Sequence, residues 1–188
     1  MPATRTLTLI LGGARSGKSS HALALARQRA QRVVFVATAT AGDAEMAARI
    51  ARHRAERPPQ WETRELPQGV GPALEANLPR AEVLLLDDLT LLVSNVLLAA
   101  IGESNPATLA AQEAARRAVE DEINALLHAY HHLPLGWIVV SNEVGWGLVP
   151  PSPLGRLYRD LLGWANRRLA AEADEVLLMV AGIPVTVK

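Results

Sequence analysis

The residues that most clearly indicate chemistry lie close to the start of the chain. Residues 12–19 read Gly-Gly-Ala-Arg-Ser-Gly-Lys-Ser, which fits the pattern G-x-x-x-x-G-K-[ST] of a phosphate-binding loop, or P-loop. Backbone N–H groups of such a loop face a phosphate chain, and the N-terminus of the following helix adds a favourable dipole. Lys18 is expected to reach the β- and γ-phosphates of a nucleoside triphosphate, and the Ser19 hydroxyl to bind Mg²⁺. The predicted nucleotide-binding residues of this loop are Gly12, Gly13, Ala14, Arg15, Ser16, Gly17, Lys18 and Ser19.

A second candidate site is an acidic pair at the end of an apolar run. Residues 83–87 read Val-Leu-Leu-Leu-Asp, and Asp88 follows directly. A carboxylate at the C-terminal end of a strand near a P-loop can hold Mg²⁺, directly or through water. Asp87 is therefore predicted to bind the nucleotide-associated metal, although the neighbouring acid leaves open which of the two serves it. The alternative for either acid is an ordinary cap of the next helix.

A third candidate is a histidine on a basic segment. Residues 43–57 are expected to form a helix capped by Asp43, and His53 lies on its polar face. Positive neighbours would attract a triphosphate and disfavour imidazolium, which leaves a neutral nucleophile near pH 7. From the spacing alone, an ordinary surface histidine is the better interpretation. The neighbouring cations are Arg49, Arg52, Arg54 and Arg57.

The elements that must position these residues alternate between strand and helix, which is the mark of α/β architecture. Short apolar runs predict strands, mostly rich in Val, Leu and Ile as expected of strands buried on both faces. Pro184 suits an antiparallel edge strand at the end of the chain. The predicted fold is a P-loop NTPase with a mainly parallel, RecA-like sheet flanked by helices. The expected strands are 6–11, 33–38, 83–87, 137–141, 175–180 and 184–187, and the expected helices are 20–32, 43–57, 105–132 and 152–173, with a loop at 66–72 and another at 141–151.

The composition narrows the possible functions. The 188 residues are predicted to form a single domain, 1–188, and the 19 basic and 19 acidic residues give a net charge of zero. Nucleic-acid binders usually carry a basic excess or a basic run, and this sequence has neither. The sequence has no cysteine, which excludes disulfides and thiol nucleophiles. The most apolar stretch, 83–101, contains two acids and is not expected to span a membrane. A cytoplasmic location is the expectation.

Taken in chain order, these motifs resemble those of a known enzyme family. The sequence is similar to the bifunctional adenosylcobinamide kinase / adenosylcobinamide-phosphate guanylyltransferases of cobalamin biosynthesis, over nearly its whole length. The P-loop alone would not single out this family, whereas the His53 helix and the loop Asn142-Glu143-Val144-Gly145 together do. The matching segments are 12–19, 36–39, 43–58, 61–65, 86–90 and 141–145.

The resemblance implies two reactions at one nucleotide site. The γ-phosphoryl group of GTP or ATP would pass to the hydroxyl of cobinamide, a corrinoid. A histidine, here His53, would then attack the α-phosphorus of GTP and carry GMP to cobinamide phosphate. The resemblance also implies that Glu65 reads guanine and that the enzyme is a homotrimer. Separately, we predict that the His53 helix moves when nucleotide binds. Further nucleotide-lining residues that the resemblance implies are Ala37, Thr38, Ala39 and Arg54.

Two alternatives and one departure accompany this interpretation. A P-loop kinase without the transferase step would use His53 only to bind phosphate. A GTP-driven switch protein would carry an Asn-Lys-x-Asp motif and an Asp-x-x-Gly switch, and the sequence contains neither at the expected place. The departure is Asp88, which stands where many relatives of this family carry cysteine.

Overall fold

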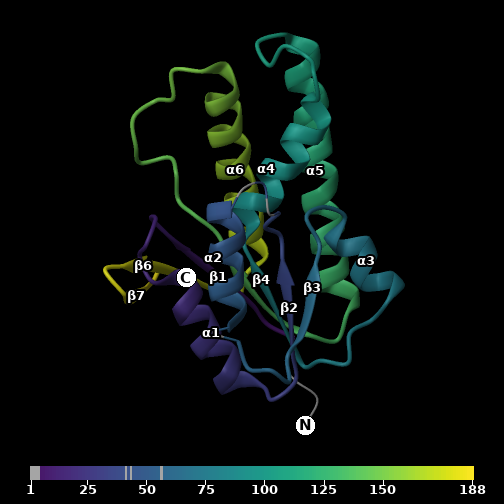
Figure 1. Ribbon diagram of the computed structural model, residues 1–188, viewed down its shortest axis with the longest axis vertical. Helices are drawn as coiled ribbons and strands as arrows, with labels where there is room; N and C mark the ends of the chain where they lie inside the picture. The colour runs from purple at the N-terminus through teal and green to yellow at the C-terminus, as the bar shows by residue number, and fades with distance from the viewer. Residues whose placement is uncertain (1–4, 41, 43, 56) are drawn as a thin grey trace.

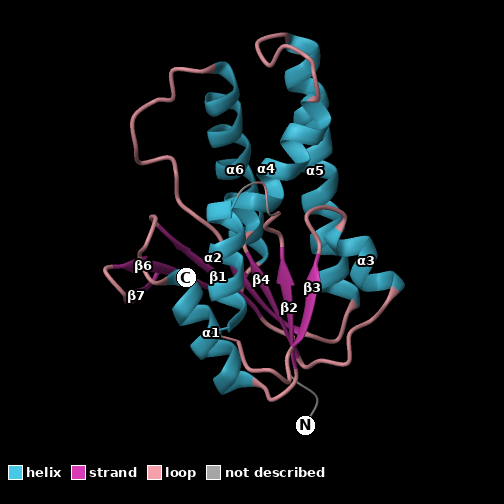
Figure 2. Cartoon of the chain, viewed as in Figure 1, coloured by secondary structure: helices cyan, strands magenta, loops and turns pink. Residues whose placement is uncertain are grey.

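The computed structural model describes residues 5–40, 42, 44–55 and 57–188, and it contains seven strands and six helices in that part of the chain. Figures 1 and 2 show their arrangement. The strands are β1 (Leu7–Gly12), β2 (Val33–Ala37), β3 (Glu62–Glu65), β4 (Val83–Asp87), β5 (Gly136–Val140), β6 (Glu175–Val180) and β7 (Ile183–Thr186). The helices are α1 (Lys18–Arg29), α2 (Ala44–Ala55), α3 (Val70–Ala76), α4 (Leu89–Ile101), α5 (Leu109–His132) and α6 (Pro153–Glu172).

All seven strands belong to one sheet, in the order β3-β2-β4-β5-β1-β6-β7. Five of its pairings are parallel, and β6 with β7 forms an antiparallel edge pair in which Met179 opposes Pro184. The predicted α/β class, the mainly parallel sheet and the antiparallel edge are thus confirmed. Because parallel strands all run in the same direction, their C-terminal ends lie on one side of the sheet. The residues that follow β1, β2, β4 and β5 gather there.

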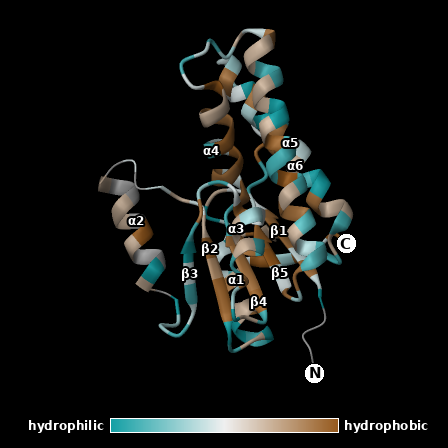
Figure 3. Ribbon diagram, turned by 90° about the vertical axis from the view of Figure 1, so that its right-hand side faces the viewer, coloured by the Kyte–Doolittle hydropathy of each residue, from teal (hydrophilic) through white to brown (hydrophobic). Residues whose placement is uncertain are grey.

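The strands alternate their side chains between two apolar cores, one on each face of the sheet. On one face, Phe35, Ile138 and their neighbours pack against α1. On the other face, Leu9, Leu86 and their neighbours pack against α3, α4, α5 and α6. Helix α4 is apolar along most of its surface, as Figure 3 shows, because it lies between the sheet, α5 and α6. Within the described ranges, the structure has no helix with the length and hydropathy needed to cross a membrane.

Three local predictions were wrong, each for a physical reason. Strand β3 was not predicted, because Glu-Thr-Arg-Glu has no apolar alternation and needs only to pair along the edge with β2. Helix α3 begins at Val70, inside the predicted loop 66–72, after Gly69 in the left-handed conformation. Helix α5 begins at Leu109 rather than beside Asn105, because the Thr108 side chain caps it.

The other predicted helices agree with the structure to within a few residues. The Ser152 side chain accepts a hydrogen bond from Gly155 N and caps α6, with Pro153 as its first residue, as predicted. Helix α2 forms within the expected segment 43–57. The predicted cap of that helix, Asp43, lies outside the described residues.

Candidate active site

The P-loop connects β1 to α1 and is fixed at both sides by backbone hydrogen bonds. Glu143 N donates to Gly12 O at 3.1 Å, and Gly182 N donates to Ser16 O at 3.0 Å. Gly12 has φ +153°, and a Cβ there would lie 2.8 Å from the Met179 carbonyl oxygen, so the position requires glycine. The Ser16 hydroxyl is buried without a hydrogen-bond partner among the described residues. The loop is therefore held in place by its neighbours, and it keeps an unused polar group inside.

Lys18 is buried at the mouth of the P-loop. Its Nζ donates a hydrogen bond to Gly13 O at 2.6 Å. Burial lowers the pKa of Lys18, while the nearby charges of Asp88 and Asp87 oppose that shift. The ammonium group thus lies between the loop backbone and two acids, where a phosphate chain could replace the Gly13 carbonyl as its partner.

Ser19 and Asp87 meet at the sheet edge, as expected for two residues that share a metal. Ser19 Oγ donates to Asp87 Oδ1 at 3.3 Å. Strand β5 lies between β1 and β4, yet the two side chains meet because the parallel strands end at one edge. Asp88 has a different contact, since its Oδ1 accepts from Leu91 N at 2.7 Å and caps α4. The geometry therefore favours Asp87 over Asp88 as the partner of Ser19.

A cavity of about 220 Å³ opens beside this pair. It brings together hydroxyl, carboxylate, amide and guanidinium groups from the ends of β2, β4 and β5 and from α1, α2 and α4. Such a mixture can hold a phosphate, a metal ion and a polar acceptor side by side. Its lining residues are Ser19, Ala37, Ala39, Ile50, Arg57, Asp87, Asp88, Thr90, Leu91 and Asn142.

Thr38, predicted to line the nucleotide site, is fully buried behind the cavity. Its hydroxyl donates to Asp88 O at 2.7 Å and accepts from Asp88 N at 3.0 Å. Its carbonyl accepts from Asn95 Nδ2 at 2.8 Å. In this structure the Thr38 side chain fixes the end of β4, and contact with nucleotide stays a prediction.

Arg57 lines the cavity, although its sequence position marked it only as a neighbour of His53. Its guanidinium carbon lies 3.4 Å from the centre of the Phe35 ring, which is a cation–π arrangement. Its Nε is buried without a hydrogen-bond partner among the described residues. Burial lowers the pKa of Arg57, and the charge of Asp87 opposes that shift. The arginine cluster around position 53 was the signal that could have identified it.

Helix α2 places the predicted nucleophile near this cavity. Its Ile50 lines the cavity, and Arg54 Nη1 lies 3.9 Å from Glu65 Oε1 at the end of β3. The backbone of His53 belongs to the same helix, three residues after Ile50, whereas its side chain lies outside the described residues. Figure 3 shows α2 on the outer side of β3, at the edge of the sheet.

The predicted loop after β5 carries part of the family resemblance, and one of its residues reaches the cavity. Asn142 donates through both N and Nδ2 to Thr90 Oγ1, at 2.9 and 3.0 Å. Asn166 Nδ2 donates to Asn142 O at 3.0 Å, which ties α6 to the same point. Trp146, in the same loop, is 78% exposed and does not line the cavity.

Comparison with known proteins gives this geometry a chemical context. A family model described as cobinamide kinase / cobinamide phosphate guanyltransferase matches residues 8–187. The chain belongs to this family. It is 44% identical to the bifunctional adenosylcobalamin biosynthesis protein CobU of Salmonella typhimurium, over 97% of this chain and 99% of that protein. It is 43% identical to the Escherichia coli protein of the same name, again over 97% and 99%.

The cobinamide kinase / guanyltransferase family membership confirms the resemblance inferred from the motifs. Among solved structures, the RadB recombinase matches with a TM-score of 0.49 and 17% identity, over 94% of this chain and 74% of that one. Within the cavity the structure brings together four of the predicted residues. These are Ser19, Ala37, Ala39 and Asp87. Glu65, the predicted guanine reader, lies outside it with a 67% exposed side chain.

Proposed function

We propose that this protein phosphorylates cobinamide with GTP or ATP and then transfers GMP from GTP to cobinamide phosphate. The observation that carries the proposal is the meeting of buried Lys18, Ser19 and Asp87 beside a cavity, in a chain of this family. The single sheet supports treating residues 1–188 as one functional domain. A homotrimer is a further expectation from the family resemblance, and a cytoplasmic location is an expectation from the composition.

In the kinase step, the cobinamide hydroxyl oxygen attacks the γ-phosphorus and loses its proton to water. The bond between that phosphorus and the β-bridging oxygen breaks, and a nucleoside diphosphate leaves. Lys18 and the P-loop N–H groups would hold the β- and γ-phosphates, and Arg57 would add positive charge from the other side of the cavity. The reaction then depends mainly on positioning and on charge stabilisation.

Mg²⁺ fits the donors present at this site. Ser19 Oγ and Asp87 Oδ1 are hard oxygen ligands 3.3 Å apart, beside the P-loop that would hold the β- and γ-phosphates. A bound Mg²⁺ would neutralise charge on the phosphate oxygens. The two residues would hold the ion, and Asp88 would remain the cap of α4.

In the transferase step, an imidazole nitrogen of His53 attacks the α-phosphorus of GTP. The bond from that phosphorus to the α,β-bridging oxygen breaks, and pyrophosphate leaves. A phosphate oxygen of cobinamide phosphate then attacks the same phosphorus and releases the imidazole. We propose that Glu65 accepts hydrogen bonds from the guanine N–H and amino groups, with Arg54 beside it. In a binding competition, Glu65→Ala should reduce the ratio of the affinity for GTP to the affinity for ATP.

The transferase proposal is tested with GTP labelled at the α-phosphate. The full chain is incubated with labelled GTP and Mg²⁺ and then denatured. One sample is treated with acid and another with alkali. We expect a protein-bound label that is lost in acid, stable in alkali and absent from His53→Ala. His131→Ala, which alters a histidine at the end of α5 that does not line the cavity, is the matched control and should keep the label. Absence of label in the wild type, with γ-phosphate still passing to cobinamide, would leave a kinase alone.

A further inference from the structure

A cluster of imidazoles and a carboxylate lies between α3 and α5, at a distance from the nucleotide site. Glu75 belongs to α3, and His128 and His132 belong to the last two turns of α5. The chain reaches the start of β5 just after His132, so the cluster lies toward the sheet edge opposite the P-loop. One possible ligand atom from each of the three residues lies within 4.8 Å of the other two.

Helix α3 is fixed on α5 in a way that holds Glu75 in place. The Glu122 carboxylate accepts from Gly69 N at 2.8 Å and from Val70 N at 2.9 Å. One turn along α5, a Cβ at Gly71 would lie 2.3 Å from Ala125 O, so the two backbones are in close contact. The next turn of α5 carries His128, whose Nδ1 lies 2.7 Å from Glu75 Oε1. The scaffold thus sets the distance between Glu75 and His128.

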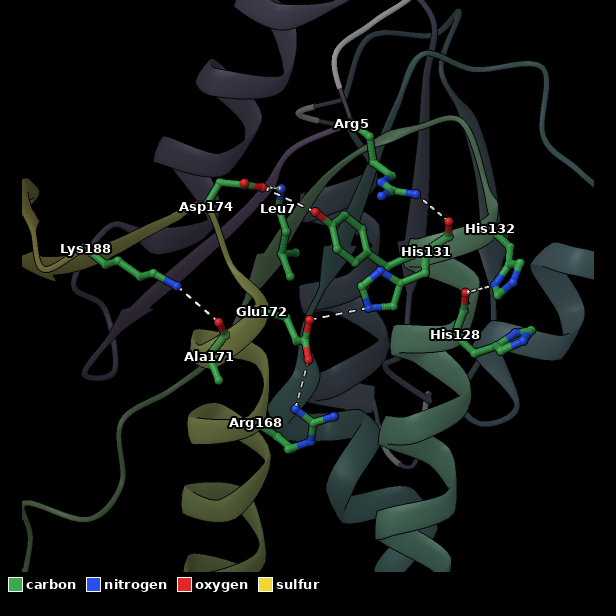
Figure 4. Close-up of polar contacts among 11 residues, drawn as sticks. Arg5, Leu7, His128, His131, His132, Arg168, Ala171, Glu172, Asp174 and Lys188 are labelled. Carbon is green, nitrogen blue, oxygen red and sulfur yellow. Dashed lines mark hydrogen bonds and ion pairs between the residues drawn. The ribbon is translucent and has the colours of Figure 1, made fainter.

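The two imidazoles are oriented alike. His128 Nδ1 faces the Glu75 carboxylate, and His132 Nδ1 lies 2.8 Å from the His128 carbonyl oxygen. Both partners only accept hydrogen bonds, so each Nδ1 carries the proton and each neutral ring keeps a lone pair on Nε2. Figure 4 shows both rings on the side of α5 away from His131. They are stacked with centroids 4.0 Å apart, so a ring has to turn before both Nε2 lone pairs can meet on one ion. Metal-binding histidines usually have such an acceptor behind the ring.

We propose that His128 and His132 bind a divalent transition-metal ion such as Zn²⁺ through Nε2, with Glu75 orienting the His128 ring. Histidines at positions i and i+4 of a helix are a known spacing for zinc ligands. Nitrogen ligands favour Zn²⁺ and similar ions over Mg²⁺. The side chains of His128 and Glu75 are 59% and 35% exposed, so the ion reaches the site from solvent. Both ligands of the ion would belong to α5, and the hydrogen bond between His128 and Glu75 would connect the site to α3.

Calorimetric titration of the tag-free full chain with Zn²⁺ tests this site. Excess Mg²⁺ is present so that Ser19 and Asp87 are occupied. We expect saturable binding of one ion per chain, weakened tenfold or more in His128→Ala and in His132→Ala. Glu75→Gln should weaken binding by about tenfold, as expected for loss of an orienting carboxylate.

His131→Ala is the matched control, because His131 lies on the same turn but contacts Glu172 instead, at 3.4 Å. It should bind Zn²⁺ as the wild type does. His132→Gln repeats the test with a smaller change of shape, and circular dichroism without metal checks the fold of each variant. Absence of saturable binding in the wild type, or unchanged binding in His128→Ala and His132→Gln, would overturn the proposal.

Discussion

The P-loop and helix α2 both lie at the C-terminal ends of the strands, but they are attached to the sheet in different ways. The P-loop is joined to its neighbours by backbone hydrogen bonds from Glu143 and Gly182 and by a buried lysine. Among the described side chains of helix α2, Arg54 forms an ion pair with Glu65, and both of these side chains are about two-thirds exposed. An exposed ion pair contributes at most about 1 kcal/mol. The predicted phosphate site is therefore already formed without nucleotide, whereas we expect the helix that carries His53 to move when nucleotide binds.

The largest expected effect comes from Lys18 in the P-loop. Lys18→Ala should lower kcat/KM of both the kinase and the transferase steps by roughly 10³-fold, because both need charge on the phosphates neutralised. Lys188→Ala is the control, since its Nζ donates to the carbonyl oxygens of Ala170 and Ala171 at the end of α6. Assays of cobinamide phosphate and GDP-cobinamide measure the two steps. A loss confined to one step would contradict a shared site.

The acidic pair separates metal binding from helix capping. Asp87→Asn should lower kcat/KM of both steps by about 10²-fold, since it weakens the carboxylate that faces Ser19. Asp88→Asn is the matched comparison and should cost less than about tenfold, because asparagine also caps helices well. Rates measured over a Mg²⁺ titration distinguish them. A larger loss in Asp88→Asn would assign the metal to the other acid.

Arg57 lies between helix α2 and the sheet, since it follows α2 and stacks on Phe35 of β2. Arg57→Ala should weaken nucleotide binding about tenfold, which is about 1.4 kcal/mol. Arg57→Lys should recover only part of this, because the planar stacking is lost. The control is Arg32→Ala, an exposed arginine paired with Glu82. Unchanged binding in Arg57→Ala would remove this residue from the site.

The smallest expected effect concerns the buried Tyr158 and the pH dependence of the free energy of unfolding. Burial, helped by the charge of Asp88, raises the pKa of Tyr158 from 10.0 to about 12. The unfolded phenol loses its proton near pH 10 while the folded phenol keeps it, so the unfolding free energy falls as pH rises above 10. Between pH 10 and 11 this loss is at most about 1 kcal/mol. Urea unfolding of Tyr158→Phe should show a shallower fall, and an identical fall would contradict the assignment.

The two regions also differ in how far the sequence predicts them. The P-loop is one continuous motif, so its residues and the ends of β1 and α1 could be placed from spacing alone. The cavity draws on residues from separate segments, and it depends on β5 lying between β1 and β4, which no local pattern encodes. Strand β3 carries charged residues because it lies at an edge, and its sequence has no strand signal. Arg57 and Asn142 belonged to predicted motifs, but only this assembly places them in the cavity.

The measurement that tests the central claim most directly follows both products in one incubation of His53→Ala with cobinamide, GTP and Mg²⁺. We expect cobinamide phosphate to accumulate at a rate within about threefold of the wild type, while GDP-cobinamide is not formed. Lys18→Ala in the same assay should form neither product at a comparable rate. GDP-cobinamide formed by His53→Ala at the wild-type rate would contradict the division between a fixed phosphate site and a helix that carries the nucleophile.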